Sequence, residues 1–302
     1  MIRLGSRGSQ LALWQANHVA ALLRGEGHSV EVEVIKTTGD RLQEVTFAQV
    51  GTKGMFTLEI EEALDAGRID LAVHSLKDLP TQLPAQFTLG AIPVRVDPRD
   101  VVVSKDFARL QDLPSGARVG TSSLRRRSQL RSLRPDLEYV EFRGNVDTRL
   151  RKLGEGQVEA IILAAAGLDR LEKTGWIRER LEPELVCPAA GQGALAIEIR
   201  AGDVRMMDAV AFLDDAVTRF AVTAERIALD ALGGGCQVPI GVHCRKLKDA
   251  EFEILGAVAH PDGSRVVRSR VVGDNAEDLG HAVAADLLQQ GVSELFEGIG
   301  TH

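Results

Sequence analysis

The sequence predicts an α/β protein with two lobes of alternating strands and helices and a small third α/β domain. A strand, a polar turn and an amphipathic helix follow one another at the start of the chain, and the same order returns after residue 118. Proline-containing segments separate the repeats, and further strands and helices follow residue 215. With 302 residues, 44% of them hydrophobic, the chain can form two or three domains.

Four segments predict the first lobe. Residues 2–6 are expected to form a strand, and apolar residues recur at helical spacing across 9–23. Residues 30–35 alternate apolar and acidic side chains, as a half-exposed strand does. Residues 69–73 form the short apolar run that is typical of a buried parallel strand.

The second lobe repeats this order. Residues 118–123 predict a strand and a turn, a helix follows until Pro135, and 158–163 predict another buried strand. The third domain is predicted from a helix at 215–233, strands at 252–259 and 265–272 joined by a turn at 261–263, and a last helix at 276–290.

Two irregular segments predict a double crossing between the lobes. Pro93 and Pro98 disfavour a helix in the first segment, and residues 187–193 form the second. We therefore expect a discontinuous first lobe at 1–93 and 194–211, a second lobe at 94–193, and a C-terminal domain at 216–302.

The charge distribution predicts a compact anionic ligand. The chain has a formal charge of -7, yet residues 118–152 hold nine arginines and Lys152 against four acids. Arginine binds carboxylate or phosphate through two parallel hydrogen bonds. The acidic balance disfavours nucleic acid and anionic membranes, and one Tyr and two Trp provide few platforms for stacking bases.

The three cysteines suit a reducing compartment. Cys187, Cys236 and Cys244 form no CxxC pair, which argues against structural zinc and against a disulfide framework. No secretory or membrane-spanning run is evident, so we expect a cytoplasmic protein. From the cysteine pattern we also expect no metal. Cys236 follows three glycines, which leaves its sulfur accessible, whereas Cys244 follows Val242 as a structural cysteine would. A reactive and an inert role for Cys236 are equally compatible with this setting.

Several arginines fall where α/β proteins bind ligands. Arg125, Arg126 and Arg127 begin a helix that Ser122 or Ser123 would cap, where a bound anion offsets the unfavourable helix dipole. The equivalent turn of the first lobe holds Arg7 and Ser9, and Arg143, Arg149 and Arg170 follow later predicted strands or turns. Ordinary solvated arginines are the alternative. His74 is expected to be a hydrogen-bonded core histidine, and Lys77 with Asp78 to be either a surface ion pair or part of the site.

Six segments together resemble the porphobilinogen deaminase family, also called hydroxymethylbilane synthases, over nearly the full chain. They are Arg7 to Ala16, Lys53 to Phe56, His74 to Pro80, Gly120 to Arg126, Arg143 to Leu150 and Gly234 to Gly241. The resemblance implies two lobes similar to periplasmic binding proteins and a small third domain. It also implies a transferase that joins four porphobilinogen molecules head to tail and releases ammonia at each step. Hydrolysis then releases the product, hydroxymethylbilane, from the enzyme.

The resemblance also implies roles for individual residues. A dipyrromethane cofactor, one per chain, would be attached through a thioether to Cys236, and Asp78 would be the catalytic aspartate. Each pyrrole carries an acetate and a propionate, which would explain the density of arginines. The side chains of the cofactor would be held by Lys77, Asp78, Thr121, Ser123, Arg125 and Arg126. The substrate and the growing chain would be bound by Arg7, Ser9, Arg143, Arg149 and Arg170. A mobile loop would contain Lys53 and Phe56. Arg127 is an addition to the family's arginine pair and is expected to face solvent.

Two other classes of protein would share some of these features. A non-catalytic anion-binding module would explain a basic cleft but not the glycine-rich setting of Cys236. A nucleic-acid binder would explain the arginines but not the acidic surface. We expect a monomer that binds porphobilinogen and neither nucleic acid nor membrane.

Overall fold

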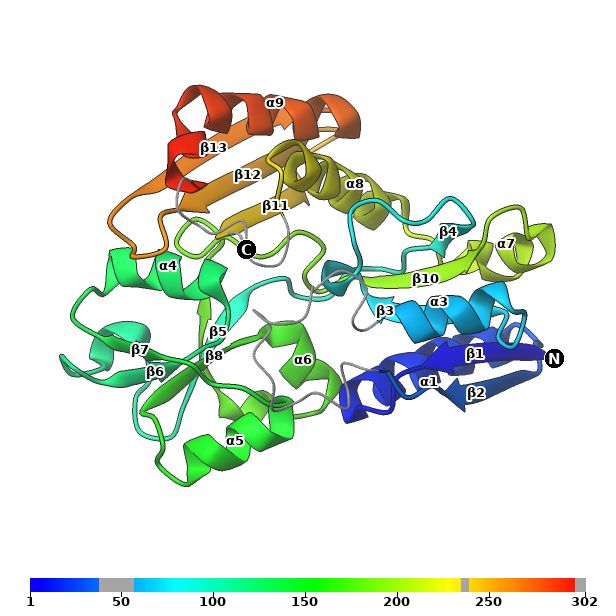
Figure 1. Ribbon diagram of the computed structural model, residues 1–302, viewed down its shortest axis with the longest axis horizontal. Helices are drawn as coiled ribbons and strands as arrows, with labels where there is room; N and C mark the ends of the chain where they lie inside the picture. Colours follow the sequence, from blue (N-terminus) through cyan, green and yellow to red (C-terminus); the bar gives the residue numbers. More distant parts are fainter. Residues whose placement is uncertain (38–56, 235–238, 297–302) are drawn as a thin grey trace. The chain divides into compact units, whose positions relative to one another are not determined.

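The structure of the protein is a computed structural model that describes residues 1–37, 57–234 and 239–296 (Figure 1). The chain forms two compact units. The first joins Met1–Val96 to Ala194–Arg219, and the second joins Asp97–Gly193 to Phe220–His302. The second unit contains the second lobe together with the C-terminal sheet, so the boundaries of three separate domains stay a prediction.

The first unit is built on a five-stranded sheet in the order β2-β1-β3-β10-β4. The first three strands in that order are parallel, and β10 runs antiparallel to both of its neighbours. The strands are β1 (Ile2–Ser6), β2 (Val30–Val34), β3 (Leu71–Ser75), β4 (Phe87–Ala91) and β10 (Leu195–Arg200). The helices are α1 (Gln10–Gly25), α3 (Leu58–Asp65), α7 (Val204–Val210) and the short 3₁₀ helices η1 (Leu76–Asp78) and η4 (Ala211–Leu213).

Helix α1 forms where the helical spacing of apolar residues predicts it. Ser9 caps its first turn by accepting a hydrogen bond from the backbone N–H of Ala12, which is otherwise unpaired in a helix. Ala16, Val19 and Leu23 lie on one face and are fully buried in the core with the sheet strands. The buried stripe therefore fixes α1 against the sheet.

The second unit contains a sheet of the same design, in the order β7-β6-β8-β5-β9. Strands β7, β6 and β8 are parallel, and β5 runs antiparallel to its two neighbours. The strands are β5 (Asp100–Ser104), β6 (Arg118–Gly120), β7 (Glu138–Val140), β8 (Ala160–Ala164) and β9 (Ile177–Leu181). The helices are α4 (Leu124–Leu133), α5 (Val146–Gly154), α6 (Ala165–Arg170), η2 (Leu110–Asp112) and η3 (Thr174–Trp176).

The antiparallel strand of each sheet follows directly from a crossing. Strand β5 begins four residues after the chain leaves Val96, and β10 begins two residues after Gly193. The predicted α/β class with two lobes and a double crossing is confirmed. The predicted strands at 2–6 and 252–259 have the same bounds in the structure. The sequence analysis did not predict β4, β5, β7, β9, β10 and β11.

The C-terminal part of the second unit is an antiparallel sheet in the order β11-β12-β13, from β11 (Ile240–Lys246), β12 (Phe252–Ala259) and β13 (Val266–Gly273). Helix α9 (Ala276–Gln289) lies along β12 and β13, and its Val283 and Leu287 are buried in a core with Val258 (Figure 1). Helix α8 (Ala216–Ala231) adds Ala224 and Ala228 to this core, and the short helix η5 (Val292–Phe296) follows α9. No helix in the described part of the chain is long and apolar enough to cross a membrane.

Candidate active site

In the first unit, four of the predicted site residues follow two parallel strands. Arg7 and Ser9 come directly after β1, and Lys77 and Asp78 lie in η1 directly after β3. Because β1 and β3 are parallel neighbours, both segments lie at the same edge of the sheet. Side chains from the two segments can therefore act on one ligand.

Asp78 is exposed, and among the described residues its carboxylate forms no hydrogen bond or ion pair. Lys77 and Arg7 are both half-buried. The strand that leads to Asp78 is held by two polar contacts: Gln15 of α1 donates to Ser75 Oγ at 2.8 Å, and His74 Nε2 lies 2.9 Å from Glu198 Oε2. His74 is 7% exposed, so the prediction of a hydrogen-bonded core histidine is confirmed.

In the second unit, Thr121 and Ser123 shape the turn between β6 and α4. The Thr121 hydroxyl is buried and accepts from Ser123 N–H at 3.2 Å, and Ser123 caps α4 by accepting from Arg126 N–H at 3.4 Å. Gly120 precedes the turn, and a Cβ there would lie 2.6 Å from Cγ of Phe142. The chain therefore requires glycine at this point and a serine cap three residues later, and the prediction that Ser122 or Ser123 caps the helix is confirmed.

Arg125 and Arg126 are both buried, at 6% and 7% exposure, and share one carboxylate. Arg125 Nη1 donates to Asp100 Oδ2 at 2.7 Å, and Arg126 Nε donates to Asp100 Oδ1 at 2.9 Å. Burial alone would raise the pKa of Asp100, but the two guanidiniums outweigh it and hold the pKa well below its usual range. Two buried positive charges thus face one negative charge.

Arg127 is half-buried, with its Nε buried and without a hydrogen-bond partner in the described part of the chain. The expectation that it faces solvent therefore holds only in part. Arg127 is the fourth residue of α4, and the burial of its Nε leaves only part of the side chain in contact with water.

Arg143 and Arg149 lie on either side of the Gly144-Asn145 turn that starts α5. Asn145 caps the helix by accepting from Thr148 N–H at 2.8 Å, Arg143 Nε is 2.5 Å from Glu141 Oε1, and Arg149 Nε donates to the Gly144 carbonyl at 2.7 Å. Burial, with a smaller contribution from neighbouring Arg126, lowers the pKa of Arg149 to about 10. An anion bound here would remove this penalty.

Arg170 ends α6 and is 6% exposed. Its Nη2 donates to the Gly193 carbonyl at 2.8 Å, and burial lowers its pKa to about 10. Strands β7, β6 and β8 are parallel neighbours, so the segments that follow them lie toward the same sheet edge. Strand β7 is followed by Arg143, β6 by Arg125 and Arg126, and β8 by Arg170. The structure therefore gathers the predicted arginines of the second lobe on one edge.

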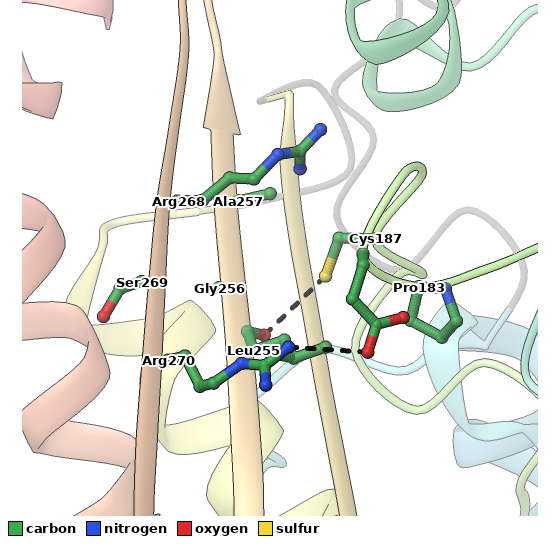
Figure 2. Close-up of a pocket in the computed structure, with 9 residues that line it drawn as sticks. Pro183, Cys187, Leu255, Gly256, Ala257, Arg268, Ser269 and Arg270 are labelled. Carbon is green, nitrogen blue, oxygen red and sulfur yellow. Dashed lines mark hydrogen bonds and ion pairs between the residues drawn. The ribbon is translucent and has the colours of Figure 1, made fainter.

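Cys236, Lys53 and Phe56 lie outside the described residues. Cys187 and Cys244 are buried, at 1% and 2% exposure. Figure 2 shows Cys187 beside a pocket of about 220 Å³, with its thiol directed toward the carbonyl of Leu255, 3.7 Å away. Burial raises the pKa of Cys187 to about 12, so this thiol stays protonated and a poor nucleophile. The structural role expected of Cys244 agrees with its place in β11.

The sequence analysis missed Asp100 and Gln192. Gln192 is fully buried and donates to Asp100 Oδ1 at 2.8 Å and to the Pro98 carbonyl at 2.6 Å. A signal was present, because an aspartate that opens the otherwise apolar run Asp100 to Val103 requires a buried partner. Its partners could not be named, since they follow much later in the chain.

Two family models match most of the chain. Residues 2–208 match the model described as "Porphobilinogen deaminase, dipyromethane cofactor binding domain", and residues 219–289 match "Porphobilinogen deaminase, C-terminal domain". The chain belongs to the porphobilinogen deaminase family. The porphobilinogen deaminase of Roseiflexus sp. (strain RS-1) is 51% identical over 98% of this chain and 98% of its own length, and that of Brevibacillus brevis is 49% identical over 97% and 96%.

Solved structures similar to the chain include two-lobed binding proteins. A putative methionine-binding lipoprotein from Bacillus subtilis is 13% identical with a TM-score of 0.43, over 70% of this chain and 89% of its own. A nutrient-binding protein from Burkholderia cenocepacia bound to methionine is 17% identical with a TM-score of 0.44, over 70% of this chain and 90% of its own.

The porphobilinogen deaminase motif around Cys236 falls within the C-terminal family match, and the other predicted site residues fall within the first match.

Proposed function

We propose that this chain is a porphobilinogen deaminase. It condenses four porphobilinogen molecules head to tail on a dipyrromethane primer with loss of ammonia, and then releases hydroxymethylbilane by hydrolysis. The observation that carries the proposal is the set of arginines at one edge of the second lobe. Arg125, Arg126 and Arg170 are buried there, and among the described residues only Asp100 is a buried carboxylate partner of these three.

This arrangement fits a ligand with many carboxylates. Burying guanidiniums without counter-ions is unfavourable, and the pKa values of Arg149 and Arg170 near 10 record that cost. A carboxylate that accepts two parallel N–H bonds removes much of it. Acetate and propionate groups on pyrrole rings supply such carboxylates, so the arginine set fits the side chains of a dipyrromethane.

The cofactor, when bound through Cys236, supplies a tethered pyrrole as the starting point for chain growth. Arg125, Arg126, Lys77, Thr121 and Ser123 hold its side chains, and Arg7, Ser9, Arg143, Arg149 and Arg170 bind the incoming substrate and the growing chain. Lys53 and Phe56 lie outside the described residues, and their role stays the one implied by the family's motifs. These residue roles follow the family's motifs, and the positions of the described residues at the sheet edges support them.

Asp78 provides the electrostatic help that the condensation needs. When the aminomethyl C–N bond of porphobilinogen breaks, ammonia leaves and a positive charge spreads over the pyrrole. A carboxylate near the pyrrole nitrogen stabilises this charge as it develops. Asp78 suits the role because its carboxylate is exposed and uncommitted within the described residues. We further propose that the enzyme acts as a monomer in the cytoplasm.

Mass spectrometry of the intact protein tests the proposal. The purified protein is expected to exceed its sequence mass by one dipyrromethane and to colour with Ehrlich's aldehyde reagent. Cys236→Ser is expected to lose both signals and all tetrapyrrole formation, whereas Cys244→Ser is the matched control and should keep the adduct. A wild-type protein without excess mass, or a Cys236→Ser protein with normal turnover, would contradict the proposal.

A further inference from the structure

Asp100 occupies an unusual position for a carboxylate. It is the first residue of β5, directly after a crossing, and is 0% exposed. Its Oδ2 accepts from Arg125, and its Oδ1 accepts from Arg126 Nε and from Gln192 Nε2. Arg126 Nη2 is also 2.7 Å from Oδ1. Every one of these partners is itself buried.

The hydrogen bonds leave the two arginines in different situations. Arg126 donates through Nε to Asp100, through Nη1 to the Ile162 carbonyl at 3.2 Å, and through Nη2 to Gln192 Oε1 at 3.5 Å. All three nitrogens of Arg126 are thus bound by the lobe. Arg126 is therefore fixed in position by the lobe, and only its remaining Nη N–H groups can reach a ligand.

Arg125 is held by one nitrogen. Its Nη1 donates both to Asp100 and to the Cys187 carbonyl, each at 2.7 Å, while its Nε and Nη2 form no hydrogen bond with the described residues. Nε and Nη2 form the edge of a guanidinium that binds a carboxylate through two parallel bonds. Asp100 thus occupies one end of Arg125 and leaves this edge available.

The charges support the same division. Asp100 neutralises one of the two buried guanidiniums, so the three side chains together carry one excess positive charge. Burial lowers the pKa of Arg126, and the opposing effect of the Asp100 charge is smaller, so the pKa stays below its usual value. A single ligand carboxylate at the Nε–Nη2 edge of Arg125 would complete the neutralisation.

We propose that Asp100 is a positioning residue that orients Arg125 so that its Nε–Nη2 edge binds a carboxylate of the pyrrole cofactor. This inference rests on the proposed function, because it takes the cofactor as the source of the carboxylate. Asp100 touches no ligand itself and acts through the guanidinium.

The test compares Asp100→Asn and Asp100→Glu with Asp97→Asn. Asp97 lies in the same segment and binds Arg99 and Arg180 instead, which makes it a matched control. For each purified protein, intact mass gives the fraction that carries the cofactor, and a time course with porphobilinogen gives the rate at which added rings appear. Thermal unfolding, followed by circular dichroism, reports the stability of each variant separately.

We expect Asp100→Asn to lower cofactor occupancy and ring addition at least about tenfold and Asp97→Asn to leave both near wild type. Asp100→Glu keeps the charge but moves it by one methylene, so it is expected to fold and still to lose about threefold or more. If Asp100→Asn does not fold, Asp100→Glu decides. Wild-type occupancy and rate in Asp100→Glu, or a loss of stability alone in Asp100→Asn, would overturn the inference. A wild-type protein without excess mass would instead overturn the proposed function.

Discussion

The side-chain amide of Gln129 pairs with the backbone of Cys187 in the manner of a neighbouring strand. Gln129 Oε1 accepts from the Cys187 N–H at 2.8 Å, and Gln129 Nε2 donates to the Cys187 carbonyl at 3.1 Å. Gln129 is fully buried on α4, the helix that carries Arg125 and Arg126. This pair therefore joins the arginine helix to the second crossing segment.

Gln129→Ala is expected to destabilise the second unit. The substitution leaves the buried N–H of Cys187 without its amide partner, at a cost of about 1 to 3 kcal/mol, while the carbonyl keeps its bond from Arg125. Urea unfolding measures the loss, and Gln157→Ala, at an exposed glutamine of the same lobe, is the control. Equal unfolding free energies for the two variants would show that the pair contributes nothing.

Asp78→Asn is expected to fold, to carry cofactor, and to lose about 100-fold or more in turnover, because a neutral amide cannot stabilise a developing cation as a carboxylate does. Steady-state kinetics with porphobilinogen measure the loss, and intact mass checks that the cofactor is present. The control is Asp208→Asn, at an exposed aspartate on α7. Near-normal turnover in Asp78→Asn would refute the catalytic role.

Arg149→Met is expected to separate stability from activity. Removing a desolvated charge whose pKa is lowered to about 10 offsets the loss of its bond to the Gly144 carbonyl, so stability should change by less than about 1 kcal/mol. Binding of the anionic chain should weaken, with kcat/KM at least about tenfold lower. Arg151→Met, at an exposed arginine paired with Glu155, is the control. A variant with unchanged kcat/KM would remove Arg149 from the site.

Arg126→Leu is expected to impair both cofactor loading and folding stability. The substitution removes a guanidinium assigned to cofactor binding. It also removes two contacts of the buried Asp100 carboxylate. Breaking a buried ion pair by removing one partner costs about 3 to 5 kcal/mol. Chemical denaturation and intact mass measure the two effects, and wild-type loading and stability would contradict the assignment. Arg131→Leu on the same helix is the comparison.

Cys187 is expected to resist alkylation in the folded protein. Its pKa is raised to about 12, so iodoacetamide at pH 8 should label it only after unfolding, as peptide mass spectrometry would show. The raised pKa also stabilises the fold at low pH, a contribution lost as pH rises from about 9, where the unfolded thiol ionises, to about 12. Cys187→Ala should lack this part of the alkaline destabilisation. Rapid labelling of the native protein would contradict the burial of this thiol.

Local patterns determined much of the fold. The periodicity of α1, the apolar run of β3 and the turn between β12 and β13 each follow from neighbouring residues, and the structure has these elements where they were predicted. The run Leu195 to Arg200 gives no local indication that its strand pairs antiparallel with β3, because strand pairing depends on residues more than a hundred positions away. The same limit applies to β5, because its pairing with β8 also joins residues far apart in the chain.

The sequence by itself determined the α/β class, the family and the residue types of the site, because motifs and periodicities are local. Only the tertiary structure decided which arginines are buried and which carboxylate they share. Asp100 meets Arg125, Arg126 and Gln192 through folding alone, since those residues come from α4 and the second crossing. A buried charge takes its partner from three-dimensional packing, and packing brings together residues that sequence patterns leave unconnected.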